Sequence, residues 1–310
     1  MISCTEFIPA YSELFTYLED KCGRGEVDKF WAYLFAPTGK GIPLVNHLLA
    51  EGIRGAYTYW SGSLNEEAAD FTMYLNEKAG WFSLAMHRCP SKGRLLELRE
   101  TIGITPYRDY CLHCDCYRYA VEKAGFKYIY DFRGIDRASC SILIYDPEIF
   151  DGRVIVDADT EIMDRRAGDN EYFHPDFHSS MNMGIHYIGE KFGEAGVREF
   201  LTRFAERVYR TDMERLGREG LTALEEMIKD TYLKEKRGEA VDFETDGGSL
   251  TVRVEYCPAV THLKATGREV SPWFSYTSSV VMEMLAKAVG KSYKLISYNE
   301  ENGASEYRFE

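Results

Sequence analysis

The sequence predicts an α+β fold made of two homologous domains, each a helical layer packed on a small antiparallel sheet, related by a pseudo-twofold axis. Three observations predict it. The second half of the chain repeats the first, each half starts with apolar residues at helical spacing, and each half ends in short runs of alternating apolar residues. The two copies are expected to span residues 1–150 and 151–310.

The repeat is visible as identical residues at a nearly constant offset. The runs 82–90 and 250–258 are both β-patterned, and both end in Cys-Pro. The offset drifts by about two residues, as small loop deletions would produce. The further matches pair Tyr17, Lys21, Gly23, Val27, Phe30, Gly52 and Gly80 with Tyr187, Lys191, Gly193, Val197, Phe200, Gly220 and Gly248.

In the first copy, helical spacing predicts a helical front half, and a mixed back half follows. Gly23 is placed to end the first helix, and Ser63 is placed to cap the fourth, with Glu66 in its first turn. Pro90 suits the start of the helix after the first strand. Helices are expected over residues 11–22, 26–35, 44–50, 64–77 and 111–124, and strands over 81–88, 126–132 and 140–145, with Pro37, Gly39 and Gly41 breaking the helical region.

The second copy shows the same order of elements. Helices are expected over residues 177–190, 195–208, 221–234 and 278–288, and strands over 250–256, 292–297 and 305–309. A further strand is expected over residues 153–157, close to the junction between the copies.

Composition restricts the classes of function. The 310 residues are 45% hydrophobic, which is enough for two ordinary cores, and the net charge of -13 is spread along the chain. Nucleic acid and anionic membrane surfaces are therefore not expected as partners. No apolar run approaches the roughly 18 residues of a membrane span. Five of the eight cysteines lie between Cys89 and Cys140, which indicates chemistry in a reducing cytoplasm more than disulfide staples.

The back half of the first copy carries three short motifs: Cys89-Pro90 at a strand end, Cys114-Asp115 at a helix start, and Cys140-Ser141-Ile142 on the last strand. These motifs resemble the family of L-2-amino-thiazoline-4-carboxylate hydrolases. In layout, the chain is similar to vinyl-4-reductase and haem nitric-oxide-binding domains. The resemblance implies a small-molecule pocket between the helical and sheet layers. The tandem duplication, and His113 and Cys116 inside the motif, depart from the family pattern.

The segment from Cys111 to Cys116 is the candidate functional site. The matching stretch of the second copy, from Tyr276, contains no cysteine or histidine. Core packing alone predicts similar residues in both copies, so the difference favours function. On a helix start, Cys111 and Cys114 share one face, and His113 and Cys116 share another.

Three interpretations of this segment stay open. In a catalytic site of Cys111, His113, Cys114 and Asp115, Cys114 attacks an amidine or imide carbon and His113 or Asp115 moves the proton. In a zinc site, the ligands come from Cys111, His113, Cys114 and Cys116; alternatively, Cys111 and Cys114 supply two thiolates from one face, and Cys89, His87 or Cys140 completes the tetrahedron. In the third interpretation, the cysteines are core residues beside the sheet.

Four residues outside the segment are candidates for ligand binding: His87, Cys89, Cys140 and His178. Cys89 precedes a helix start, where the helix dipole is expected to lower its thiol pKa. Its counterpart Cys257 stands in the copy without a cluster, which favours packing instead. His174 and His178 are four residues apart on an expected helix, either as half of a composite site or as a polar cluster in water.

The expected function is a small-molecule hydrolase that acts on a cyclic C–N substrate, such as an amidine or a thiazoline-like ring. Two alternatives remain: a non-catalytic small-molecule-binding or sensor protein, and a zinc-stabilised structural cluster with the active site elsewhere. Replacement of Cys114, ligand-dependent stabilisation and metal analysis distinguish the three.

Overall fold

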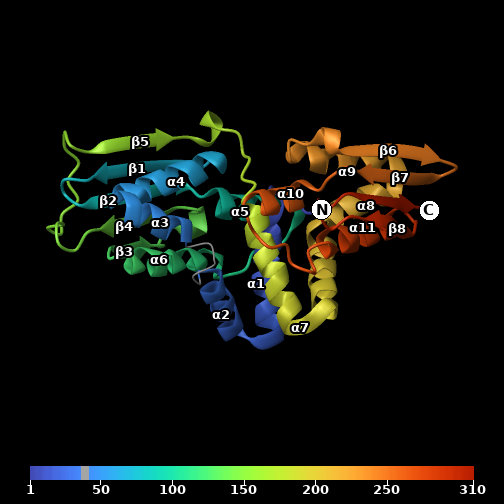
Figure 1. The fold of residues 1–310 in the computed structure, drawn as a ribbon, viewed down its shortest axis with the longest axis horizontal. Helices are drawn as coiled ribbons and strands as arrows, with labels where there is room; N and C mark the ends of the chain where they lie inside the picture. Colours follow the sequence, from blue (N-terminus) through green and yellow to red (C-terminus); the bar gives the residue numbers. More distant parts are fainter. Residues whose placement is uncertain (36–41) are drawn as a thin grey trace. The chain divides into compact units, whose positions relative to one another are not determined.

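A computed structural model describes residues 1–35 and 42–310, and it confirms an α+β fold with two antiparallel sheets (Figure 1). The chain forms two compact units. Unit 1 contains residues 1–17, 101–105 and 175–310, and unit 2 contains residues 18–100 and 106–174. These units cut across the predicted ranges 1–150 and 151–310, because α1 (Phe7–Cys22) runs from one unit into the other. The pseudo-twofold duplication stays a prediction.

Unit 2 places helices over one five-stranded sheet. The strand order is β3-β4-β2-β1-β5, and every neighbouring pair is antiparallel. Its strands are β1 (Asp70–Asn76), β2 (Trp81–Arg88), β3 (Lys127–Asp131), β4 (Cys140–Tyr145) and β5 (Glu161–Arg165). Its helices are α2 (Arg24–Leu34), α3 (Ile42–Glu51), α4 (Arg54–Glu66), α5 (Pro90–Ile102) and α6 (Tyr117–Lys123), and the end of α1.

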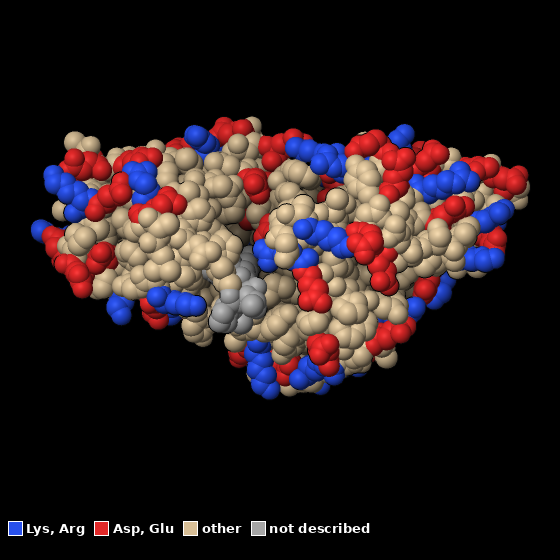
Figure 2. Space-filling view, in the orientation of Figure 1, with Lys and Arg blue, Asp and Glu red and all other residues tan. Residues whose placement is uncertain are grey.

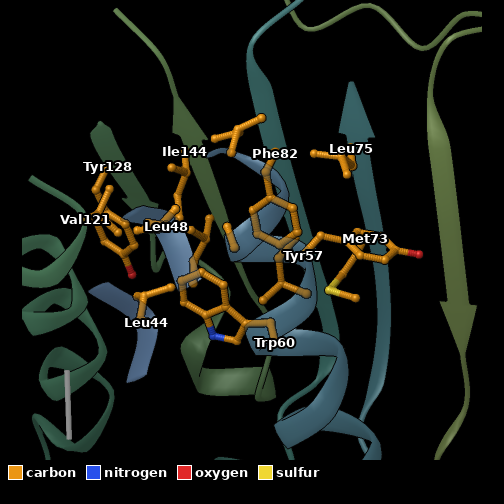
Figure 3. Close-up of a cluster of buried hydrophobic side chains, with 14 of the residues drawn as sticks. Leu44, Leu48, Tyr57, Trp60, Met73, Leu75, Phe82, Val121, Tyr128 and Ile144 are labelled. Atoms are coloured by element: carbon orange, nitrogen blue, oxygen red, sulfur yellow. The ribbon is translucent and has the colours of Figure 1, made fainter. Parts of the chain in front are cut away.

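The core of unit 2 lies between this sheet and helices α3, α4 and α6 (Figure 3). Alternate residues of β2, Phe82, Leu84 and Met86, enter it, as the period of two along a strand requires. The ring of Trp60 on α4 stacks on Phe82, with centroids 5.7 Å apart. This contact connects the helical layer to the middle of the sheet.

Two sequence predictions in unit 2 are wrong. Residues 64–77 do not form one helix: α4 ends at Glu66 and β1 begins at Asp70, because Phe71, Met73 and Leu75 alternate into the core. Residues 153–157 form no strand, and the apolar side chains there are exposed. The strand of that region is β5, which pairs with β1. The predicted helix breakers Pro37, Gly39 and Gly41 lie outside the described residues.

The predicted helix 111–124 is two elements. Residues 110–116 form a 3₁₀ helix, η1 (Tyr110–Cys116), and α6 follows from Tyr117. A 3₁₀ helix has three residues per turn, so residues three apart lie one above another. Cys111 and Cys114 therefore still share one face of η1, and His113 and Cys116 share another.

Unit 1 contains the start of α1, five further α-helices and a four-stranded antiparallel sheet of order β6-β7-β9-β8. The helices are α7 (Phe177–Val208), α8 (Arg210–Glu219), α9 (Leu221–Lys234), α10 (Pro258–Ala265) and α11 (Tyr276–Ala288). The strands are β6 (Val241–Asp246), β7 (Ser249–Val254), β8 (Tyr293–Tyr298) and β9 (Ser305–Phe309). Of these, α8, α10 and β6 have no counterpart in the ranges predicted from the sequence.

Two glycines take the same backbone conformation at equivalent points of the sequence repeat. Gly23, between α1 and α2, has φ 82° and ψ 170°. Gly193, at a kink inside α7, has φ 66° and ψ -169°. This region of backbone space is essentially restricted to glycine.

The two sheets also share a strand order and a register. In order, β6-β7-β9-β8 corresponds to β1-β2-β4-β3, and β5 is an additional edge strand of unit 2. Met86 pairs with Cys140, the first residue of β4, and Val254 pairs with Ser305, the first residue of β9. Ser305 thus occupies the strand position that Cys140 occupies in unit 2.

On the face shown in Figure 2, Lys and Arg side chains are interspersed with Asp and Glu side chains, with wide uncharged areas between them. Among the described residues, every helix is too short or too polar to cross a bilayer.

Candidate functional site

The predicted segment 111–116 lies on the 3₁₀ helix η1 of unit 2. Two tyrosines of β3 hold its backbone: the Tyr130 hydroxyl donates to the carbonyl oxygen of Cys111 at 3.3 Å, and the Tyr128 hydroxyl donates to that of Cys114 at 3.0 Å. These contacts satisfy carbonyl groups that a short 3₁₀ helix leaves open. The segment is therefore fixed to the sheet at both cysteines.

His113 and Cys114 form a histidine–thiol pair. The Nε2 atom of His113 lies 3.6 Å from the Sγ atom of Cys114, and the Nδ1 atom contacts the carbonyl oxygen of Tyr110. A carbonyl oxygen can only accept, so Nδ1 carries a proton in this arrangement. Neutral His113 then presents the Nε2 lone pair to the thiol, which is the arrangement that activates a cysteine nucleophile.

Aromatic rings surround His113, which is buried. Its imidazole meets the Tyr110 ring edge to face, with centroids 5.0 Å apart, and the Trp31 ring of α2 lies 6.5 Å away. Such packing restricts the ring to one orientation. Cys114 itself is half-buried, so this side chain is in part open to solvent.

Cys89 and Cys140 lie close to the same segment. Cys89 follows β2, and its backbone N–H donates to Ala138 at 2.6 Å. Cys140 opens β4 directly opposite Met86. Together with Cys114, both cysteines pack against the core between the sheet and helices α3, α4 and α6. The structure thus brings together three of the predicted site cysteines.

Burial keeps four of the nearby thiols protonated at neutral pH. It raises the pKa of Cys111 and Cys140 to about 11 and that of Cys116 to about 12. Burial also raises the pKa of Cys89, and the neighbouring Cys111 and Cys140 raise it further. The prediction that the helix start lowers the Cys89 pKa is wrong, because desolvation outweighs the N–H of Lys92, 3.5 Å from Sγ.

Lys92 and the two β3 tyrosines are site residues that sequence reasoning missed. Lys92 is a buried lysine in the first turn of α5, and its positive charge favours the Cys111 thiolate, although burial dominates the pKa of that thiol. The available signal was positional: Lys92 follows Cys89 by three residues, and Tyr128 and Tyr130 alternate along β3. Only the hydrogen bonds of the folded chain reveal that both tyrosines reach η1.

Asp115 points to a different partner. Its Oδ1 atom accepts a hydrogen bond from Arg118 at 2.7 Å, and both side chains are more than one-third exposed. The structure shows an exposed ion pair at this position rather than a carboxylate on His113. The helix α6 that follows is thereby stabilised in its first turn.

Two predicted ligand-binding histidines, His87 and His178, have hydrogen-bond partners other than the cysteines of η1. His87 is exposed, and it follows Met86, whose side chain faces the core, so His87 faces the opposite side of the sheet. The Thr72 hydroxyl donates to Asp164 at 2.6 Å and accepts from His87 Nε2 at 2.7 Å. His178 belongs to unit 1, where it lies 3.0 Å from Glu235.

His174 also has a carboxylate partner, Glu66, at 2.6 Å. It precedes α7, which begins at Phe177, so the expected helical pairing of His174 with His178 is wrong. The two histidines lie in different compact units.

A zinc site requires several histidine, cysteine or acidic side chains that converge on one point. Within residues 1–35 and 42–310, no three histidine, cysteine or acidic side chains converge as a metal site. Cys111, His113, Cys114 and Cys116 are thus not arranged as a set of zinc ligands.

No family model, curated protein or solved structure matches this chain.

Proposed function

We propose that the chain is a cysteine hydrolase that opens a small cyclic C–N substrate, with Cys114 as the nucleophile and His113 as its base. One observation carries the proposal: the Nε2 atom of His113 lies 3.6 Å from Cys114 Sγ, while Nδ1 is committed to the Tyr110 carbonyl. The resemblance of the cysteine motifs to thiazoline-carboxylate hydrolases supports the choice of substrate class.

The reaction follows from these two side chains. His113 takes the proton of the Cys114 thiol, and the sulfur attacks the amidine carbon of the ring. The imidazolium then gives its proton to the departing nitrogen, and the ring C–N bond breaks to leave a thioimidate on Cys114. Water, deprotonated by His113, adds to that carbon. The C–S bond breaks, and the proton returns from His113 to the sulfur.

The other thiols do not compete for this role. Cys89, Cys111, Cys116 and Cys140 have raised pKa values, so almost none of each is thiolate at neutral pH. Among the described residues, no hydrogen bond joins any of these four to an imidazole, whereas one joins Cys114 to His113. Cys114 is therefore the thiol with an adjacent base.

Turnover of 2-amino-thiazoline-4-carboxylate by two matched variants tests the proposal. Cys114→Ala removes the nucleophile and should lower turnover by about 1000-fold or more. Cys116→Ala, two residues away on the same segment, should stay within about twofold of the unmodified chain. The product is followed as ring-opened compound by mass spectrometry, and circular dichroism confirms that both variants fold. Equal turnover in the two variants would falsify the assignment.

A further inference from the structure

Unit 1 contains a pocket of its own, which the proposed chemistry does not use. It has a volume of about 80 Å³ and lies beside the first turn of α11, the strands β8 and β9, and Cys257 at the start of α10. All residues that line it belong to unit 1. Its size suits one small organic molecule.

The lining carries hydroxyl groups but no charged side chain. The hydroxyl groups come from Ser278 and Ser279 on α11, from Ser305 on β9, and from Ser275, Thr277 and four tyrosines, and the remaining walls are mainly aromatic or aliphatic, with Cys257 among them. Among the described residues that line the pocket, none is Lys, Arg, His, Asp or Glu. A charged ligand would lose its hydration here without gaining a counter-charge from a side chain. Met1 also lines the pocket, and burial lowers the pKa of its amino group, which favours the neutral amine, so the pocket favours neutral ligands.

The three serine hydroxyls are available to a ligand. In the part of the chain that the structure describes, no protein group hydrogen-bonds to the side-chain oxygen of Ser278, Ser279 or Ser305. Thr277 differs, because its hydroxyl donates to the Phe274 carbonyl at 2.7 Å. The pocket thus offers donors and acceptors that the fold itself does not use.

Tyrosine rings form a large part of the lining. Tyr307 is buried, and its ring lies 5.5 Å from that of Tyr293. Burial raises the pKa of both phenols and raises that of Tyr298 to about 12, so the wall stays neutral at physiological pH. Flat aromatic walls select flat ligands, because ring stacking depends on close parallel or edge contact.

The strand register relates this pocket to the cysteine cluster of unit 2. Cys257 and Cys89 both stand immediately before the first proline of a helix. Ser305 stands opposite Val254 as Cys140 stands opposite Met86. Unit 1 therefore carries a hydroxyl at the position of a thiol, and its pocket has no imidazole in its lining. The replacement of Cys140 by Ser305 retains a hydrogen-bonding group at this strand position.

We propose that this pocket is a second small-molecule site, which binds an uncharged planar ring compound that carries hydrogen-bonding groups and does not react there. The proposal stands independently of the hydrolase chemistry in unit 2. It makes unit 1 a ligand-binding unit in its own right.

Isothermal titration of the full chain with three probes tests it. Phenol is flat, neutral and able to hydrogen-bond; benzoate adds a charge, and cyclohexanol removes the flat ring. Phenol should bind at one site, and the other two probes should bind at least tenfold more weakly. Absence of phenol binding, or benzoate binding as tight as phenol, contradicts the proposal.

Variants locate the binding. The triple change Ser278→Ala, Ser279→Ala and Ser305→Ala keeps the packing and should weaken phenol binding by about tenfold or more, since each hydrogen bond contributes about 1 kcal/mol. Ser305→Trp fills the pocket and should abolish binding. Ser61→Ala on α4 is the control and should bind as the unmodified chain does. If the triple variant binds phenol unchanged, the assigned site is wrong, whether or not the Trp variant folds.

Discussion

The imidazole of His113 lies between the carbonyl oxygen of Tyr110 and the sulfur of Cys114, with 3.6 Å from Nε2 to Sγ. The two residues are adjacent in the sequence, on the 3₁₀ helix η1. Burial raises the pKa of the Cys111, Cys116 and Cys140 thiols. Among the described residues, Cys114 is the cysteine of this segment with a hydrogen bond to an imidazole.

Alkylation should separate the cysteines at neutral pH. Two pKa units above an ordinary thiol lower the thiolate fraction about 100-fold. Cys111 and Cys140, with pKa values of about 11, should therefore react slowly with iodoacetamide at pH 7. Cys22, which is exposed, provides the reference rate. Peptide mass spectrometry measures each site, and rapid labelling of Cys111 in the folded chain would contradict the account.

Asp115→Asn should leave turnover within about twofold, because the carboxylate pairs with Arg118 and surface pairs of this kind contribute about 0–1 kcal/mol. The sequence interpretation, in which Asp115 moves the proton, predicts a large loss instead. Steady-state kinetics of this variant and of Cys114→Ala distinguish an Asp115 that pairs only with Arg118 from an Asp115 that moves the proton. A loss as large as that of Cys114→Ala supports the carboxylate.

Gly23→Ala and Gly193→Ala should each lower the free energy of unfolding by about 1–3 kcal/mol. Space is not the reason, since a Cβ at either position meets no atom within 4 Å. The cost comes from positive φ, 82° at Gly23 and 66° at Gly193. Gly62→Ala, inside α4 and equally open, should be neutral or stabilising by up to about 1 kcal/mol. Urea unfolding provides the values, and similar effects at all three sites would refute the backbone explanation.

Glu235 should give unit 1 an acid-dependent stability. Burial alone would raise its pKa, but hydrogen bonds from His178 and from the Cys4 N–H outweigh burial and hold the pKa below 4.5. A lowered pKa means that the carboxylate stabilises the fold above pH 4.5 and that this contribution is lost as the pH falls.

Glu235→Gln therefore should cost about 1–3 kcal/mol at pH 7, and the difference from the unmodified chain should shrink toward pH 3. Glu226→Gln serves as the control, because that side chain is 65% exposed. Chemical unfolding across this pH range tests the sign. A difference that grows as the pH falls is incompatible with the lowered pKa.

The sequence predicted the limits of an element correctly where the apolar periodicity lies within that element alone. Strand β4 and helix α9 begin and end at the predicted residues, since an alternating run and an amphipathic run each define their own limits. The α+β class is confirmed for the same reason. The helix predicted over 64–77 failed because Ser63 lies inside α4, which ends at Glu66, and not at a helix start, and because a strand pattern begins at Phe71.

The candidate site was predictable in part. The cysteines and His113 were identified from the asymmetry between the two halves, and the structure places Cys89, Cys114 and Cys140 against one core. What residue types alone could not reveal was which partner each group meets. Asp115 meets Arg118, and His178 meets Glu235, through contacts that depend on tertiary packing.

The central claim is that His113 acts as the base for Cys114, and the alkylation rate of Cys114 in a His113→Ala variant tests it most directly. Iodoacetamide labelling is measured by mass spectrometry from pH 6 to 9, with Cys22 in the same chain as the internal reference. The account predicts that the variant loses about tenfold or more of the Cys114 rate at neutral pH and leaves Cys22 unchanged. Equal Cys114 rates with and without the imidazole would contradict it.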